Sequence, residues 1–436
     1  MLNILAAPAL AAGLLALPAA SGSPALGPLN GIYPDLEALY IDLHQTPELS
    51  LHEEKTSAKM AARLKALGYE VTERVGGFGV VGVMKNGKGP TVLVRADMDA
   101  LPILEKTGLP YASKVKVKND AGVEVPVMHA CGHDVHMTSL IGAATLLSKA
   151  KNRWRGTLVL VAQPAEEGGG GARNMVQDGL LTRFPKPDVA IALHDFPFLP
   201  AGQVGLTPGF ALANVDSVDI TIYGRGGHGS APQNTVDPIV IAARTVVALQ
   251  TIVSRENDPR YPAVVTVGSI HGGTKHNIIP DEVRLQLTVR TYKEEVRNRV
   301  LASIECIAKA EAAASGAPKE PSVVVDEDRG HATYNDPALT RRISGAFTAA
   351  FGKGNVVETQ PVMGGEDFGE IGTAAKIPYV LFWVGGTEPK KFAAAGGDMT
   401  RLPYIHSSEW APDREPTLKT GTAALTVAAL ELLGKP

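Results

Sequence analysis

The stretch from Met128 to His136, reading MHACGHDVH, is dense in side chains that bind metals. Three histidines, one cysteine and one aspartate lie within nine residues. Cys131 and His133 stand two positions apart, so in an extended segment their side chains would point to the same side. A thiolate and an imidazole together suit zinc or a related borderline metal. A buried free cysteine beside structural histidines would give the same pattern, so the metal hypothesis needs further ligands elsewhere.

Two adjacent glutamates, Glu166 and Glu167, follow Pro164 and precede a glycine run. In an extended segment neighbouring side chains point in opposite directions, so one carboxylate would bind a metal while the other faces a bound water. The metal lowers the pKa of that water and the second carboxylate accepts its proton, which is the chemistry of hydrolysis. The alternative is a pair of solvated loop glutamates.

His194 and His406 are the remaining ligand candidates, although a single histidine is more often structural than metal-bound. Together with Cys131, His133 and one of the two glutamates, they suffice for two metals that share ligands and water. The sequence therefore predicts a hydrolytic site with two divalent metals.

Alternating strands and helices must position these groups. The expected strands of the first half are 80–84, 91–96, 157–163 and 188–193, and the expected helices are 33–46, 53–67 and 135–150. This order indicates an α/β domain with a largely parallel sheet flanked by helices, in which ligands bind beyond the carboxyl ends of the strands. Five acidic or histidine side chains lie just past an expected strand: Asp97, Asp99, Glu166, Glu167 and His194.

The pattern changes near residue 213. Strands are expected at 215–223, 263–270, 282–291 and 322–326, and helices at 236–253 and 294–314. The order βαββαβ is that of a ferredoxin-like unit. We therefore expect a catalytic domain in two parts, 30–212 and 330–436, interrupted by an inserted domain at 213–329.

Length and charge narrow the function further. A chain of 436 residues favours two domains. Because the net charge is only −3 and no basic stripe is present, we do not expect the protein to bind nucleic acid.

Residues 1–25 resemble a secretory signal peptide, so we expect an exported protein, periplasmic or secreted, although no Lys or Arg precedes the apolar run. No later segment is expected to be long and apolar enough to span a membrane. The two cysteines, Cys131 and Cys306, are not expected to pair.

From about Tyr33 to Leu433 the chain resembles the dinuclear metal amidohydrolases that include aminoacylases, hippurate hydrolases and auxin-conjugate hydrolases, and seven motifs carry this resemblance. In chain order they read RADMDALPI, MHACGHD, QPAEEGGGGA, GRGGHGSAP, HNIIPDEV, GGEDF and IHSSEW. The resemblance implies cleavage of N-acyl amino acids, a catalytic domain interrupted by a lid that also dimerises, and a homodimer or higher homo-oligomer.

The resemblance also implies roles for single residues. The metal ligands would be Cys131, His133, Glu167, His194 and His406. Glu166 would be the general base, and His228 in the lid would steady the developing oxyanion, often across the dimer. Asn277 and Arg290 would hold the substrate carbonyl and carboxylate. A glycine-turn histidine, a turn asparagine and a strand arginine on a wet face are the alternatives for these three lid residues.

One departure bears on the substrate. The wider family of dimetal carboxypeptidases begins its site with His-x-Asp, whereas this chain has Asp97-Met98-Asp99. By resemblance, His133 would supply the missing imidazole, Cys131 would replace a bridging carboxylate, and Asp99 would orient a ligand. This pattern favours acyl amides over peptides.

Two other functions compete with this one. The protein could be a carboxypeptidase or dipeptidase on the same scaffold, or an exported metal-binding protein without turnover. Zinc is expected, with manganese, cobalt or nickel as alternatives.

Overall fold

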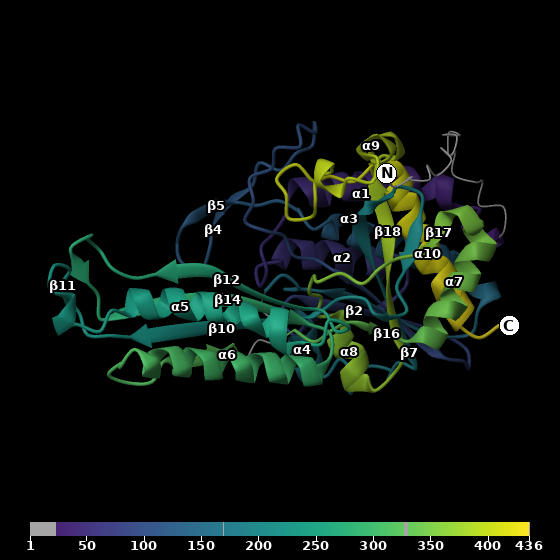
Figure 1. The fold of residues 1–436 in the computed structure, drawn as a ribbon. Coiled ribbons are helices and arrows are strands. Elements are labelled where there is room, and N and C mark those ends of the chain that lie inside the picture. Colours follow the sequence, from purple (N-terminus) through teal and green to yellow (C-terminus); the bar gives the residue numbers. More distant parts are fainter. Residues whose placement is uncertain (1–22, 169, 327–329, 436) are drawn as a thin grey trace, which may run out of the picture.

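A computed structural model describes residues 23–168, 170–326 and 330–435. Most of the expected signal segment, residues 1–22, lies outside this range. Figure 1 shows a body of helices packed around a large sheet, and an elongated part that extends away from it. The body contains an eight-stranded sheet and the extension a four-stranded sheet.

The large sheet is mixed and mostly parallel. Its strands lie in the order β1(Glu70–Val75), β2(Gly79–Asn86), β6(Gly156–Gln163), β3(Thr91–Asp97), β7(Val189–Pro200), β18(Tyr379–Thr387), β8(Val204–Leu206) and β17(Val356–Glu358). The central strands β6, β3, β7 and β18 run parallel to one another, and β1 and β2 join antiparallel at one edge. The three consecutive parallel pairs bring the carboxyl ends of four strands to the same edge.

Helices cover both faces of this sheet because its central strands are apolar on both sides. One face packs against α1(Leu29–Gln45), α2(Glu54–Ala66), α3(His133–Lys149), α7(Pro337–Phe351) and α10(Arg414–Leu432). The other packs against α4(Gly171–Gln177) and α8(Phe368–Ala375). Along β3 the side chains alternate between the two cores, with Val92 and Val94 in the first and Leu93 in the second.

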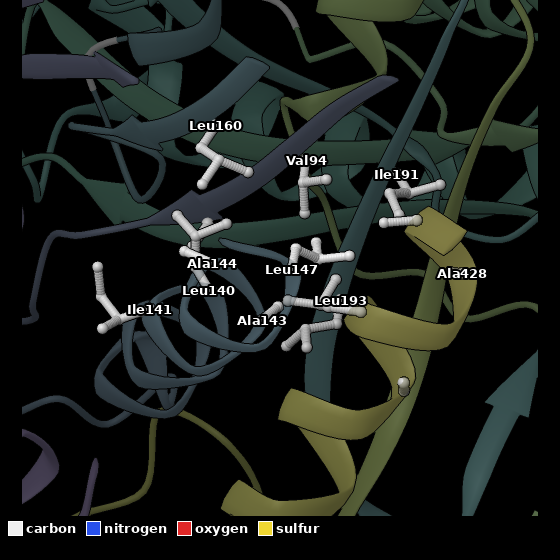
Figure 2. Close-up of a cluster of buried hydrophobic side chains, with 14 of the residues drawn as sticks. Val94, Leu140, Ile141, Ala143, Ala144, Leu147, Leu160, Ile191, Leu193 and Ala428 are labelled. Atoms are coloured by element: carbon white, nitrogen blue, oxygen red, sulfur yellow. The ribbon is translucent and has the colours of Figure 1, made fainter. Parts of the chain in front are cut away.

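Figure 2 shows the first of these cores, where α3 and α10 lie against the sheet. Leu140 and Leu147 of α3 point toward Val94 of β3 and Leu193 of β7, and all four are buried. Truncating one such leucine to alanine typically costs about 2–5 kcal/mol. This packing fixes α3, whose first turn carries His133, against the strands that carry the other polar groups.

The extension is a ferredoxin-like unit, which we call the lid domain. Its elements are β10(Asn214–Tyr223), α5(Pro238–Thr251), β12(Ala263–His271), β14(Glu282–Thr291), α6(Glu294–Ala314) and β15(Ser322–Val325). The strands lie in the order β12-β14-β10-β15, and neighbouring strands are antiparallel. Both helices pack on one face of this sheet, around a core that includes Ile220, Leu285 and Ile304. The α/β fold with a ferredoxin-like insertion is thus confirmed.

Short elements complete the chain. They are β4(Lys116–Lys118), β5(Glu124–Pro126), β9(Gly209–Phe210), β11(Gly227–His228), β13(Ile278–Ile279), β16(Tyr334–Asn335) and α9(Pro389–Ala395). The pair β11 and β13 forms a small antiparallel ribbon. Figure 1 places β11 at the end of the lid domain that lies farthest from the large sheet.

One expectation about membranes was wrong. Among the described residues, the segment Pro238–Glu256, which is α5 with one further turn, is long and apolar enough to cross a membrane by length and composition alone. Its mean hydropathy is 1.3 and a third of it, 33%, is buried in the lid domain. Ile241 and Leu249 on its inner side belong to the lid core, while Val240 and Val247 face outward.

Candidate metal centre

The site begins at a tight turn that leads into α3. Cys131 lies in this turn and His133 is the first residue of the helix. The two side chains therefore do not share one face of an extended segment, as the sequence spacing had suggested. Gly132 between them has φ 79°, and a Cβ there would stand 2.3 Å from Asp195 Oδ1. Only glycine fits this position, because both the backbone conformation and the space require it.

His133 is fully buried and its ring faces carboxylates on both sides. Its Nδ1 lies 3.3 Å from Asp99 Oδ1. Its Nε2 lies 3.7 Å from Asp97 Oδ2 and 3.9 Å from one oxygen each of Glu166 and Glu167. Neither ring nitrogen has a hydrogen-bond partner among the described residues. A buried imidazole left unpaired in front of several carboxylates fits a cation between them.

The two glutamates lie in a bend after β6 rather than in an extended segment. Ala165 before them has a positive φ of 51°, and both carboxylates face His133, so the expected opposite orientation was wrong. Asp99 holds this bend because it accepts hydrogen bonds from the backbone N–H groups of Glu166 (3.1 Å) and Glu167 (3.0 Å). The buried Asp99 carboxylate thereby orients both the bend and the His133 ring, which it faces at Nδ1.

Cys131 lies between two histidines that come from distant parts of the chain. Its Sγ is 3.5 Å from His194 Nε2 and 3.2 Å from His406 Nε2. A tetrahedral zinc with ordinary bond lengths would set a sulfur and a nitrogen ligand about 3.5 Å apart. His194 Nδ1 donates to the Asp195 carbonyl oxygen (2.7 Å), so in the neutral ring Nε2 keeps its lone pair and points at the sulfur. His194 lies within β7, not just past its end.

The ligand atoms form two overlapping groups. Cys131, His133 and His194 make one, and Cys131, Glu167 and His406 make the other, each with its atoms within 4.8 Å of one another. His406 Nε2 lies 3.1 Å from Glu167 Oε1 in the second group. All five sequence-predicted ligands thus converge on one place, and the two groups share the sulfur.

Without a metal, the surroundings of the site favour the protonated forms of two predicted ligands. Burial raises the pKa of the Cys131 thiol well above its usual range, and the charges of Glu167 and Glu166 add to this effect. Burial opposes protonation of His133, yet Asp97 and Asp99 outweigh it and raise the pKa of the ring well above its usual value. A divalent cation would reverse both tendencies and deprotonate both groups, so the donor set fits a metal.

Burial also raises the pKa of Glu166 well above its usual range, and the nearby Glu366 and Glu167 reinforce the shift. A bound cation would lower this pKa and keep the carboxylate ionised, while the neighbouring carboxylates would still favour uptake of a proton, as a general base needs.

Sequence reasoning missed a second ring of buried groups behind the ligands. His136 Nδ1 pairs with Asp97 Oδ1 at 2.6 Å, and its Nε2 accepts from the backbone N–H of Asp195 at 2.9 Å. Asp97 also accepts from Arg95 Nη1 at 2.6 Å, so both of its oxygens are already engaged. The spacing His133-x-x-His136, which places both rings on one helix face, was the sequence signal that His136 lies next to the ligands.

Arg95 anchors this ring from the middle of the sheet. Its guanidinium is fully buried and donates to Asp97, Glu366 and Asp367. Glu366 and Asp367 come from the motif GGEDF. That motif therefore neutralises a buried arginine rather than contacting the predicted ligands directly.

Two of the three lid residues, His228 and Asn277, are not brought to this site within one chain. His228 lies on β11 at the far end of the lid domain, next to Asn277, whose carbonyl oxygen accepts from Gly229 N–H at 2.9 Å. The backbone N–H of Ser230 donates to His228 Nδ1 (3.1 Å), which leaves the proton of the neutral ring on Nε2. Arg290 lies at the other end of the lid, with Nη1 beside Gly365 of the catalytic body.

The chain is similar in sequence to known proteins. The model of Peptidase family M20/M25/M40 matches residues 93–398. The chain belongs to this family. The M20 chain is 39% identical over 350 residues to hippurate hydrolase from Campylobacter jejuni, covering 80% of this chain and 87% of the relative. It is 37% identical over 397 residues to thermostable carboxypeptidase 1 from Saccharolobus solfataricus, covering 90% and 94%.

A solved structure agrees in fold. The Bacillus subtilis YXEP protein, described as a dinuclear metal binding peptidase from the M20 family, superposes with a TM-score of 0.73 at 31% identity. The match covers 93% of this chain and 100% of that one. The M20 chain is a metal-dependent hydrolase of amide bonds, so the predicted family, fold class and type of enzyme are confirmed.

Proposed function

We propose that this M20 enzyme hydrolyses N-acyl amino acids to a carboxylate and a free amino acid at a site with two divalent metals. The observation that carries the proposal is the pair of ligand groups sharing Cys131, with a Glu166 oxygen 3.9 Å from His133 Nε2 beside them. Bound metals would polarise the amide carbonyl and acidify a water. Zinc is the metal we favour, since a thiolate, three imidazoles and one carboxylate suit it.

Each nearby side chain has a defined task. Glu166 accepts the proton of the attacking water and passes it to the leaving amine. His228, as the Nε2–H tautomer, donates to the oxygen that becomes negative at the amide carbon. Asn277 at the same tip and Arg290 near the catalytic body would hold the substrate carbonyl and carboxylate.

The amide activity is tested by substrate preference. Zinc-reconstituted enzyme is assayed with N-acetyl and N-benzoyl amino acids against dipeptides of the same C-terminal residue. We expect the acyl amino acids to be cleaved with the higher kcat/KM. A preference for dipeptides would instead assign the chain to the peptidases, as one relative is named a carboxypeptidase. Glu166→Gln should keep its metals and lose turnover, and an active Glu166→Gln enzyme would overturn the role of base.

We also propose a homodimer in which His228 serves the partner's site. His228 lies at the far tip of the lid domain, so its own metal centre is out of reach in this conformation. The strand β12 is an edge of the lid sheet, and the neighbouring helix α5 exposes Val240 and Val247. An unpaired edge beside an apolar helix face suits pairing with a second copy.

Mixed dimers test this arrangement. His228→Ala and Glu166→Gln should each be inactive alone, because losing an oxyanion donor typically costs about 10²–10³ in kcat. Heterodimers of the two should regain up to about half the activity, from one intact site. Val247→Asp should yield inactive monomers, whereas Val324→Asp on the opposite edge strand should remain dimeric, although Val324 is also exposed (56%, against 71% for Val247). Active Val247→Asp monomers would exclude a site completed by the partner.

We further propose that the protein is exported, on the Ala/Leu run of residues 4–20. Fractionation of producing cells and N-terminal sequencing of the mature chain test this. An intact N-terminus on protein retained inside the cell would refute it.

A further inference from the structure

Glu53 is a buried carboxylate with no task in the proposed reaction. It precedes α2 and is 0% exposed. Within the described part of the chain no Lys or Arg pairs with it, and its Oε2 has no hydrogen-bond partner. Burial raises the pKa of Glu53 to about 7, and the charge of Asp99 contributes. Burying a carboxylate without a charged partner costs free energy of folding, so the contacts of Glu53 require an explanation.

All of its hydrogen bonds go to two strained turns. Oε1 accepts from the backbone N–H of Ala165 at 2.7 Å and from that of Leu51 at 3.1 Å. Both donors are non-glycine residues in the left-handed region, with φ 51° for Ala165 and 67° for Leu51. Residues other than glycine rarely adopt this conformation, because the Cβ then lies too close to the following carbonyl oxygen. It persists only where surrounding contacts enforce it.

Ala165 is the residue directly before Glu166. After it, Asp99 binds the backbone N–H groups of Glu166 and Glu167, and the Ala165 carbonyl accepts from Gly171 N–H at 3.0 Å. The bend is therefore held from both ends, by Glu53 in front and by Asp99 behind. A functional carboxylate must be held within about 0.5 Å of its productive position, so this clamp has a direct bearing on the rate.

We propose that Glu53 is a positioning residue that fixes the left-handed turn at Ala165 and thereby aims the Glu166 carboxylate. Glu53 touches neither the predicted ligands nor the substrate, and it acts through the backbone of Ala165 alone. The proposal rests on the proposed function only in taking Glu166 as the base. That the turn itself depends on Glu53 is a separate claim, which can be measured without turnover.

Three variants separate acceptor, length and charge. Glu53→Gln keeps an oxygen at the Oε1 position, so we expect kcat within about fivefold of wild type, since both backbone bonds can persist. Glu53→Asp withdraws the oxygen by one methylene, and Glu53→Leu removes it. Both should lower kcat by about tenfold to a hundredfold, with KM and metal content near wild type, because misaimed catalytic groups cost about that much.

Glu48 offers a matched control on the same segment. Its carboxylate also binds backbone N–H groups, at Lys55 (3.2 Å) and Thr56 (2.8 Å) in the first turn of α2, but does not reach the turn at Ala165. Glu48→Leu should lower stability with little effect on kcat. If Glu53→Leu fails to fold, Glu53→Asp carries the test.

Amide hydrogen exchange of the metal-free protein gives the deciding readout. The amide of Ala165 should exchange at least about tenfold faster in Glu53→Asp than in wild type, and at the wild-type rate in Glu48→Leu. Unchanged exchange at Ala165 in a folded Glu53→Asp or Glu53→Leu protein would overturn the clamp. If exchange rises but kcat does not fall, the turn does not aim the base. An active Glu166→Gln enzyme would overturn the proposed function while leaving the exchange result intact.

Discussion

Asp99→Asn is the most informative single change near the metals. The Asp99 side chain is buried and accepts hydrogen bonds from Ser50 Oγ (2.6 Å), Glu167 N (3.0 Å) and Glu166 N (3.1 Å), and it faces His133 Nδ1 at 3.3 Å. The asparagine amide has nearly the same size, so the substitution removes charge and one acceptor without leaving a cavity. A loss of metal binding would then reflect a change in the orientation of the ligands rather than a loss of side-chain packing.

The size of the effect follows from which oxygen is replaced. With the NH2 group in the place of Oδ2, the Ser50 hydroxyl can turn to accept, but the Glu167 N–H loses its acceptor. In the opposite orientation the Glu166 N–H loses its acceptor, and the NH2 group replaces the carboxylate oxygen that faces His133 Nδ1 at 3.3 Å, which is worse. The amide orientation with the smaller cost loses one hydrogen bond to a charged acceptor, which contributes about 1.5–3 kcal/mol. That corresponds to a 10–100-fold weaker metal affinity, in line with other ligand-orienting groups.

The assay is competition between metal-free enzyme and a zinc chelator of known affinity. Ser50→Ala is the control, because it removes only one hydroxyl donor to Asp99 and should weaken zinc binding by less than about tenfold. If Asp99→Asn bound zinc as tightly as wild type, the carboxylate would not be orienting His133 or the glutamate bend, and the reasoning above would fail.

Three further predictions concern the centre and its support. Cys131→Ser should lose zinc affinity as well as rate, and full metal content with normal turnover in a metal analysis would remove the sulfur from the ligand set. Arg95→Met should destabilise the fold by about 3–5 kcal/mol in urea unfolding, because it strands buried carboxylates, whereas Arg342→Met breaks an exposed pair with Glu431 and should cost about 0–1 kcal/mol. Burial opposes protonation of His44, but its hydrogen bonds with Asp134 and Glu105 outweigh it and raise its pKa to about 9. The charged ring therefore contributes stability, on the order of 3 kcal/mol, that is complete below about pH 6.5 and is lost as the pH rises through about 9. The stability difference between wild type and His44→Gln should shrink over that interval, and a constant difference would contradict a protonated His44.

Local patterns predicted much of the fold. The helix expected at 294–314 begins and ends where α6 does, because its apolar spacing is regular and its neighbours are turns. All five expected ligands also meet in space, as the order of the family motifs along the chain had implied. The element boundaries near the site were less accurate: α3 starts at His133, two residues earlier than expected, because Gly132 turns the chain left-handed directly before it.

Other features depend on contacts that no local pattern encodes. Arg95 reaches Glu366, which lies 271 positions along the chain, so their pairing follows from the sheet and not from spacing. Glu166 and Glu167 face the same side in a bend where Asp99 accepts from their backbone N–H groups and Glu53 accepts from that of Ala165, and an EE pair in the sequence predicts neither contact. The strand β7 continues past His194 because it stays paired with β18 as far as Pro200.

His406 lies 275 residues after Cys131, and it is the one predicted ligand with a largely exposed side chain, 48% against 9% or less for His133, Glu167 and His194. During synthesis the first four ligands leave the ribosome long before the fifth. A nascent chain can therefore hold a metal only at an incomplete set of donors, where exchange with the surroundings is fast. Which metal the finished enzyme keeps would then be decided late, once His406 has joined the other predicted ligands. Metal selection would follow the ions available in the compartment where the last thirty or so residues fold, rather than those present where translation began.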